Sequence, residues 1–167
     1  MNNNSLERTL SIIKPDAVER ELETKIKKIF LDNKLNIVDS KKIQISKEEA
    51  EKFYKVHQTK PFYEKLCSYL SSGPIIAIIL DGENAIQKNR DLMGATDPKK
   101  AKEGTIRKLY GISIDKNSVH GSDSLENAKA EIDFFFNWSR YIFYKLISIW
   151  WVFSTFFIGK AFFFNYY

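Results

Sequence analysis

The sequence has one cysteine and two histidines among its 167 residues, and this scarcity excludes several kinds of site. A lone cysteine, Cys67, cannot form an internal disulfide and leaves no cysteine cluster to hold a metal. The two histidines, His57 and His120, are far apart in the sequence and lack the spacing of zinc ligands. Cys67 falls within an apolar pattern of helical period, which predicts a buried small side chain.

The common glycine-rich phosphate loops are also missing. The one Gly-Lys pair, Gly159-Lys160, is followed by Ala161 where a Walker loop needs Ser or Thr, and no GxGxxG pattern occurs. Residues 1–10 lack the apolar stretch of a secretory signal peptide. We therefore expect a protein of the reducing cytoplasm, in which any phosphate site is built from separate segments.

The positive charge of the chain is modest. The net charge is +5, and residues 137–167 contribute basic residues but no acidic ones, which leaves a small excess for the rest. Such an excess does not indicate nucleic-acid binding, so we expect no specific nucleic-acid partner. The alternative is a contact through Lys99, Lys100 and Lys102, and it predicts an affinity for nucleic acid that falls steeply with salt.

The apolar pattern predicts one domain, residues 1–136, in which strands alternate with helices. The clearest strand is 75–80, a run of apolar residues between turn signals. Further strands are expected at 10–13, 35–45 and near 119, and helices at 15–30, 46–57, 61–70, 83–93, 104–110 and 125–135. This order predicts an α+β fold of ferredoxin-like type, with helices packed on a small antiparallel four-stranded sheet.

Local signals mark several helix boundaries. Pro15 suits the first turn of a helix that follows the first strand directly. Ser46 and Glu49 have the spacing of a capping box. The last helix is expected to be capped by one of residues 122–124 and to pack on the core through an apolar face that begins with Leu125.

Residues 137–167 differ in composition from the rest of the chain. They hold all three tryptophans and an uncharged run, 146–159, flanked by Lys145 and Lys160. A membrane-spanning helix needs about 20 apolar residues, more than this run provides. If both lysines snorkel, residues 141–164 could span a bilayer or lie on it. Three interpretations stay open: a membrane-associating tail, a non-native C-terminus such as read-through, and a segment packed on the domain or on a partner.

The segment 117–124 places His120 between a short apolar step and the start of a helix. Val119 can end a strand there, and Gly121 lets the backbone turn without a Cβ clash. The amides and the dipole of a helix N-terminus attract anions. The imidazole can therefore attack a phosphoryl group or fill a corner of the fold, and the pattern alone does not decide between them.

Three isolated cations, Lys14, Arg90 and Arg107, stand on or beside predicted elements. Each alone is typical of a solvated surface charge. Together with His120 they could form a triphosphate cradle, because phosphoryl transfer requires distributed positive charge and an aligned nucleophile. Phe62 suits stacking on a nucleobase, but it suits equally well the first core position of its helix.

Seven segments of the chain resemble the nucleoside diphosphate kinases in order and spacing. They include a Lys-Pro-Asp opening and a His-Gly-Ser-Asp motif, a combination that is highly specific. The matching segments are 7–18, 60–63, 72–74, 82–85, 90–98, 104–107 and 117–124. The resemblance extends from residue 7 to about 136, after which family members of this size normally end within a few polar residues.

The resemblance implies a role for each matched residue. His120 would accept the γ-phosphate of a nucleoside triphosphate and pass it to a nucleoside diphosphate by a ping-pong mechanism. Glu131, supported by Ser122, would orient its ring. Tyr54 would place a hydroxyl near the transferred phosphate, and Phe62 would stack on the base. Phosphate and ribose contacts are implied for Lys14, Arg90, Thr96, Arg107 and Asn117.

A cofactor and partners are implied as well. Mg²⁺ would arrive with the nucleotide phosphates, and Asp123 would reach it through water. The substrates would be ATP and other nucleoside di- and triphosphates, and family members assemble as homo-oligomers, either tetramers or hexamers. The alternative function is a catalytically inactive nucleotide-binding regulator or a membrane adaptor directed by the tail. That alternative requires an altered site, yet no matched position is altered.

Overall fold

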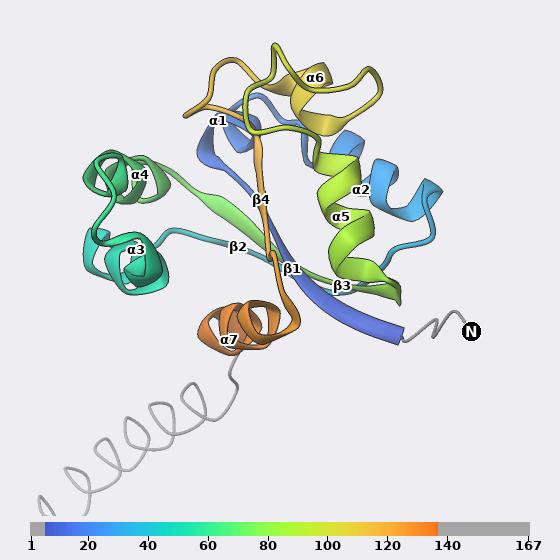
Figure 1. The fold of residues 1–167 in the computed structure, drawn as a ribbon, viewed down its shortest axis with the longest axis horizontal. Coiled ribbons are helices and arrows are strands. Elements are labelled where there is room, and N and C mark those ends of the chain that lie inside the picture. The colour runs from blue at the N-terminus through green and yellow to red at the C-terminus, as the bar shows by residue number, and fades with distance from the viewer. Residues whose placement is uncertain (1–5, 137–167) are drawn as a thin grey trace, which may run out of the picture. The chain divides into compact units, whose positions relative to one another are not determined.

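The computed structural model describes residues 6–136 as a four-stranded sheet with helices packed around it (Figure 1). The predictions for the tail, 137–167, lie outside the described residues. The elements in chain order are β1 Leu6–Ile13, α1 Pro15–Glu19, α2 Glu23–Asp32, β2 Asn36–Ile43, α3 Lys47–Phe53, the 3-10 turn η1 Lys55–His57, α4 Tyr63–Leu70, β3 Ile75–Glu83, α5 Ala85–Met93, α6 Ile106–Tyr110, β4 Val119–Gly121 and α7 Leu125–Phe136.

The sheet has the strand order β2-β3-β1-β4, and every neighbouring pair is antiparallel. β3 is central, and its residues 75–80 are buried as the apolar run predicts. A bulge between Ile37 and Asp39 interrupts the pairing of β2 with β3. The short strand β4 pairs only with β1 and brings Ile12 opposite His120. The predicted α+β class and antiparallel four-stranded sheet are confirmed.

Helices α2 and α5 cover one face of the sheet, and α7 crosses the other face (Figure 1). The core between the sheet and α2 and α5 contains Ile78 of β3, Phe30 of α2 and Met93 of α5, each at most 3% exposed. Burial of this apolar surface is the main driving force for the fold. Helices α3 and α4 lie together beyond one end of the sheet.

Several predicted boundaries are confirmed. Ser46 accepts a hydrogen bond from the amide of Glu49, whose carboxylate accepts from the amide of Ser46, so the capping box at α3 is present. Ser124 caps α7, because its hydroxyl accepts from the amide of Asn127 at 3.1 Å. Cys67 is fully buried, as its place in the pattern predicts.

Other expectations are wrong for identifiable reasons. The helix expected at 15–30 is two helices, because Glu21 between them adopts a left-handed backbone with φ 55°. His57 does not continue α3, which ends at Phe53 before the separate turn η1. Leu125 is 66% exposed, since the residues of α7 that are buried begin with Ala128.

The strand at β4 does not end at Val119 but continues through Gly121. Gly121 has no positive φ, so a sharp turn is not what requires glycine there. A Cβ at this position would lie 2.4 Å from Nδ2 of Asn89 and 2.9 Å from Sδ of Met93. The reason for glycine is therefore the close approach of α5 to the strand. Within residues 6–136, no helix is long and apolar enough to cross a membrane.

Candidate active site

One cleft of about 690 Å³ gathers nearly all the residues that the sequence singled out. It lies among α3, α4, α5, the loop before α6, β4 and α7. The matched residues in its lining are Lys14, Tyr54, Phe62, Arg90, Thr96, Arg107, Asn117, His120, Asp123 and Glu131. Ser122 does not line the cleft but contacts Glu131 from behind it.

His120 is in the middle of β4, where the alternation of a strand turns its side chain away from buried Val119 and Gly121. Its Nε2 atom lies 3.2 Å from Oε1 of Glu131 on α7. The other carboxylate oxygen of Glu131 accepts a 2.6 Å hydrogen bond from Ser122. Among the described residues, Nδ1 of His120 has no hydrogen-bond partner, so the cleft holds an imidazole with one nitrogen tied and the other available.

Two aromatic rings fix the plane of this imidazole. The ring of Phe53 is 5.3 Å from that of His120 at 72°, and the ring of Tyr54 is 5.8 Å away at 79°. Both are edge-to-face arrangements, which aromatic quadrupoles favour. Phe53 in turn packs against Phe134 and Phe135 at the end of α7. Burial raises the pKa of the Tyr54 hydroxyl, which therefore stays protonated at neutral pH.

Two of the three cationic groups, Lys14 and Arg107, are positioned by hydrogen bonds to neutral oxygens. Lys14 donates from Nζ to Oδ1 of Asn117 at 2.8 Å, and Asn117 donates to the carbonyls of Thr96 and Ile114. Arg107 donates to the carbonyls of Gly94 at 2.8 Å and Val119 at 3.1 Å. The described residues provide no ion-pair partner for Lys14, Arg90 or Arg107.

These cations destabilise one another. Burial, and after it the charge of Arg107, lower the pKa of Lys14 to about 8. Burial, and after it the charge of Arg90, lower the pKa of Arg107 to about 10. A bound anion would relieve both penalties, because an opposite charge favours the protonated forms. The cleft is therefore electrostatically suited to a polyanion such as a triphosphate.

Asp123 is the candidate metal contact, and its surroundings decide which kind of metal site fits. Its carboxylate accepts a 2.6 Å hydrogen bond from Nδ2 of Asn127, and this bond lowers its pKa, which keeps it charged. Within residues 6–136 there is no group of three or more carboxylate, imidazole or thiol ligands. One carboxylate suits a magnesium ion that is bound mainly through substrate phosphates.

The structure also decides between interpretations that the sequence left open. Phe62 is 51% exposed and lines the cleft, so it is not a core residue of α4. Leu66, one turn further along α4, also lines the cleft. Phe53 and Phe134 were missed altogether, because an aromatic residue at helical spacing looks the same whether it packs on a core or on a catalytic side chain.

Fold and cleft together define a class of protein: an α+β phosphotransferase whose histidine and unpaired cations share one nucleotide-sized cleft. A family model described as nucleoside diphosphate kinase matches residues 7–141. The nucleoside diphosphate kinase of Campylobacter jejuni subsp. jejuni serotype O:6 is 59% identical over 131 residues, which are 78% of this chain and 96% of that protein. That of Persephonella marina is 53% identical over 133 residues, 80% of this chain and 95% of that protein.

Solved structures agree with these relatives. The Aquifex aeolicus nucleoside diphosphate kinase superposes with a TM-score of 0.77 at 40% identity, covering 79% of this chain and 96% of that one. The Encephalitozoon cuniculi enzyme gives a TM-score of 0.76 at 38% identity, covering 78% and 88%. The chain belongs to the nucleoside diphosphate kinase family.

Proposed function

We propose that the cleft transfers the γ-phosphate of a nucleoside triphosphate to a nucleoside diphosphate through a phosphohistidine on His120. The observation that carries the proposal is the bond from Nε2 of His120 to Glu131, which leaves Nδ1 free in a cleft whose cations form no ion pair with any described residue. A neutral imidazole is needed, and an unperturbed histidine is mostly neutral at pH 7.

The transfer has two balanced steps. The lone pair of Nδ1 forms a bond to the γ-phosphorus while the bond from that phosphorus to the bridging oxygen breaks, and the electron pair leaves with the nucleoside diphosphate. A second diphosphate then attacks the phosphohistidine through a terminal oxygen, and the N–P bond breaks to restore the imidazole. A covalent intermediate divides one transfer into two symmetrical steps.

The other cleft residues have roles that follow from their chemistry. Lys14, Arg90 and Arg107 would neutralise the phosphates, and the buried Tyr54 hydroxyl would donate to an oxygen of the transferred group. Thr96 and Asn117 would contact phosphate and ribose. Phe62 would stack on the base, and because stacking reads a ring face and no edge pattern, it would accept any base.

Magnesium fits this site as a companion of the substrate. When bound with the nucleotide it would neutralise charge on the phosphate oxygens, and Asp123 is the cleft carboxylate suited to contact it through water. The protein contributes the cations, the imidazole and the stacking ring, which position the nucleotide whether or not the metal touches a side chain.

The test is labelling with γ-³²P-ATP and magnesium. Wild type should take up label that is acid-labile and alkali-stable, that lies on Nδ1, and that ADP or another diphosphate removes. His120→Ala should take up no label, while His57→Ala, which removes the other histidine, should still take up label on His120. Absence of label on wild type, or label on Nε2, would contradict the proposal.

Assembly and location extend this proposal. We expect a cytoplasmic homo-oligomer, a tetramer or a hexamer, as implied by the resemblance, with ATP and other nucleotides as its small-molecule partners.

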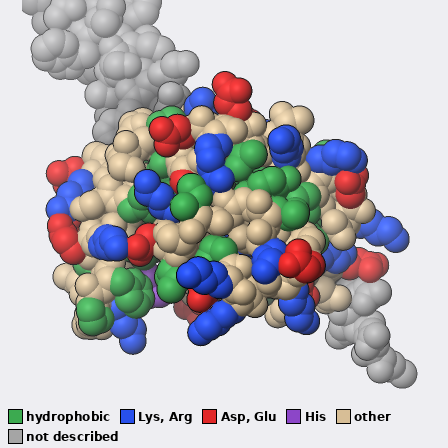
Figure 2. Space-filling view, turned by 90° about the horizontal axis from the view of Figure 1, so that it is seen from above, with side chains coloured by type: hydrophobic (Ala, Val, Ile, Leu, Met, Phe, Trp, Pro, Cys, Tyr) green, Lys and Arg blue, Asp and Glu red, His purple; other side chains and the backbone are tan. Residues whose placement is uncertain are grey.

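The rival functions lack support. A catalytically inactive regulator or membrane adaptor needs an altered site, and every matched cleft residue is present. Nucleic-acid binding needs a continuous basic surface. On the face that Figure 2 presents, acidic side chains are interspersed among the basic ones, which does not favour such binding.

A further inference from the structure

Asp16 is a buried carboxylate that the cleft does not contain. It is 5% exposed and belongs to α1, two residues after Lys14. Its Oδ1 accepts a hydrogen bond from the hydroxyl of Tyr69 on α4, and its Oδ2 accepts one from Arg20 at 2.7 Å. The hydroxyl of Ser118 lies 3.1 Å from the same Oδ2. A single carboxylate therefore joins α1, α4 and the segment before β4.

Ser118 is the corner of this network, and its backbone is unusual. Its φ is +69°, a left-handed conformation that residues with a Cβ rarely adopt. Such a conformation persists only where the surroundings fix it. The surroundings of Ser118 do so, because it is fully buried and its hydroxyl lies between Asp16, Arg20 and the carbonyl of Tyr110.

Three consecutive residues at this corner hold the cations of the cleft. Oδ1 of Asn117 accepts from Nζ of Lys14 at 2.8 Å, and the carbonyl of Ser118 accepts from the amide of Lys14 at 2.9 Å. The carbonyl of Val119 accepts from Arg107 at 3.1 Å. His120 follows directly. A displacement of Ser118 would therefore move two phosphate-binding groups and the nucleophile together.

The charge of Asp16 also acts on Lys14. The groups around the ammonium are Arg107 of α6, Asp16 of α1, Asp115 before β4, and the ring of Tyr69 on α4, whose centroid is 5.9 Å from Nζ. Burial and the charge of Arg107 lower the pKa of Lys14, whereas Asp16 is the first of two carboxylates that oppose this shift. Asp115 forms an ion pair with Lys65 at 2.6 Å, which weakens its effect.

We propose that Asp16 is a positioning residue of the phosphate site, whose carboxylate fixes the Ser118 corner and places a negative charge near Lys14. This inference rests on the proposed function of the cleft. The ion pair with Arg20, four positions along the chain, is a local contact and would not by itself connect Asp16 to the site. The bonds to Tyr69 and the contact with Ser118, which come from distant parts of the chain, are what connect it to the site.

The test compares four full-length proteins: wild type, Asp16→Asn, Tyr69→Phe and Glu19→Gln. Glu19 is the matched control, because it lies on the same helix, is exposed and is outside the network. For each protein, kcat/KM for ATP is measured from about pH 6 to pH 10, since its alkaline limb reports the free enzyme. ADP binding is measured by calorimetry over the same range, and folding by thermal unfolding.

Asp16→Asn should lower kcat/KM by about tenfold and move its alkaline limb to lower pH, because the amide keeps the shape but removes the charge. Tyr69→Phe should lower kcat/KM with the limb unmoved, because the charge stays and its orientation is lost. Glu19→Gln should match wild type. If Asp16→Asn lowers only the unfolding temperature, Asp16 is a fold residue and the inference is wrong.

Two further outcomes are decisive. If Asp16→Asn does not fold, Tyr69→Phe decides, and a wild-type kcat/KM in that variant overturns the inference. If wild type itself shows no phosphotransfer, the proposed function fails. The calorimetry still tests the positioning role, since ADP affinity must fall at alkaline pH earlier in Asp16→Asn than in wild type for the inference to hold.

Discussion

The Nε2 atom of His120 lies 3.2 Å from Oε1 of Glu131, although one residue is on a three-residue edge strand and the other is on the last described helix. The second oxygen of Glu131 is held by Ser122, whose hydroxyl also accepts from the amide of Leu10 at 3.2 Å. The carboxylate is therefore fixed at both oxygens. It selects which imidazole nitrogen faces the nucleotide.

Glu131→Gln should slow phosphorylation of His120 by roughly a hundredfold without weakening ADP binding. The amide keeps the size of the side chain, but its NH₂ group can donate to Nε2 and reverse the preferred tautomer. Rapid-quench measurement of the phosphoenzyme checks the rate. Glu126→Gln, an exposed change on the same helix, is the control. Equal rates in the two variants would show that Glu131 does not orient the ring.

Lys14 should make the folded state more stable as pH rises from about 8 to 9.5. Its folded pKa of about 8 is below the ordinary lysine value of 10.5, so in this window the unfolded chain binds more protons than the folded one. The contribution is thus least favourable below pH 8 and increases above it. Urea unfolding of wild type and Lys14→Met measures this contribution. The free energy of unfolding of wild type should rise relative to that of Lys14→Met as the pH increases. A constant difference would contradict the lowered pKa.

Gly121→Ala should destabilise the fold by about 1 to 3 kcal/mol, because the new Cβ would meet the Asn89 amide at 2.4 Å. Asn89 is fully buried, and both polar atoms of its side chain lack partners among the described residues. Asn89→Ala should therefore cost little and should partly rescue Gly121→Ala, since the close approach to Met93 remains. A double-mutant cycle in urea measures the coupling, and strictly additive changes would show that the two side chains do not meet.

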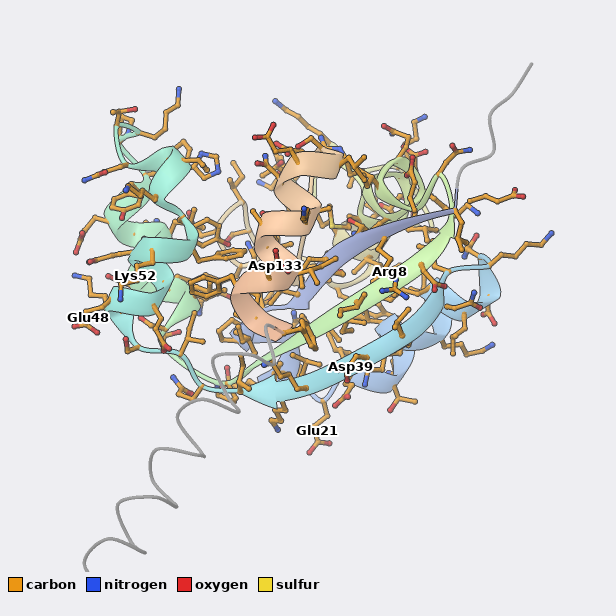
Figure 3. All side chains as sticks on the ribbon, turned by 90° about the horizontal axis from the view of Figure 1, so that it is seen from below. Arg8, Glu21, Asp39, Glu48, Lys52 and Asp133 are labelled. Carbon is orange, nitrogen blue, oxygen red and sulfur yellow. The ribbon has the colours of Figure 1, made fainter. Side chains whose placement is uncertain are left out.

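Truncation after Phe136 should leave phosphotransfer intact and increase solubility. All cleft residues lie before this point, and the rings of Phe134 and Phe135 that support Phe53 remain. Truncation after Ile132 is the contrast, because it removes these rings and should reduce activity. Figure 3 shows α7 crossing in front of the sheet, which is the placement that the shorter protein must keep. Loss of activity after Phe136 would show that the tail is structural.

Sequence patterns predicted the parts of the fold that depend on local order. The run at 75–80 is a buried strand, Ser46 begins a capping box, and strands and helices follow the expected sequence. The cleft residues were predicted from the family motifs, because no local sequence pattern indicates that Lys14 and Asn117 are in contact. What the pattern could not provide is the reason for glycine at 121, which depends on a neighbour from α5.

The network around Asp16 was beyond sequence reasoning for the same physical reason. Its partners Tyr69 and Ser118 are separated from it by 53 and 102 positions, and hydrogen bonds across such distances leave no periodic trace. The early end of α3 was missed because Tyr54 and His57 continue a helical spacing that the backbone does not follow. Tertiary contacts override local preference at both places.

The strand that carries His120 is held in place from the opposite end of the chain. Ser11 donates to the carbonyl of His120 across 109 positions, and the amide of Leu10 donates to Ser122 across 112. Both partners of each contact must be synthesised before the contact can form. On the ribosome, a growing polypeptide can therefore complete its nucleotide cleft only after almost the entire domain has emerged, and incomplete chains should have no phosphotransfer activity.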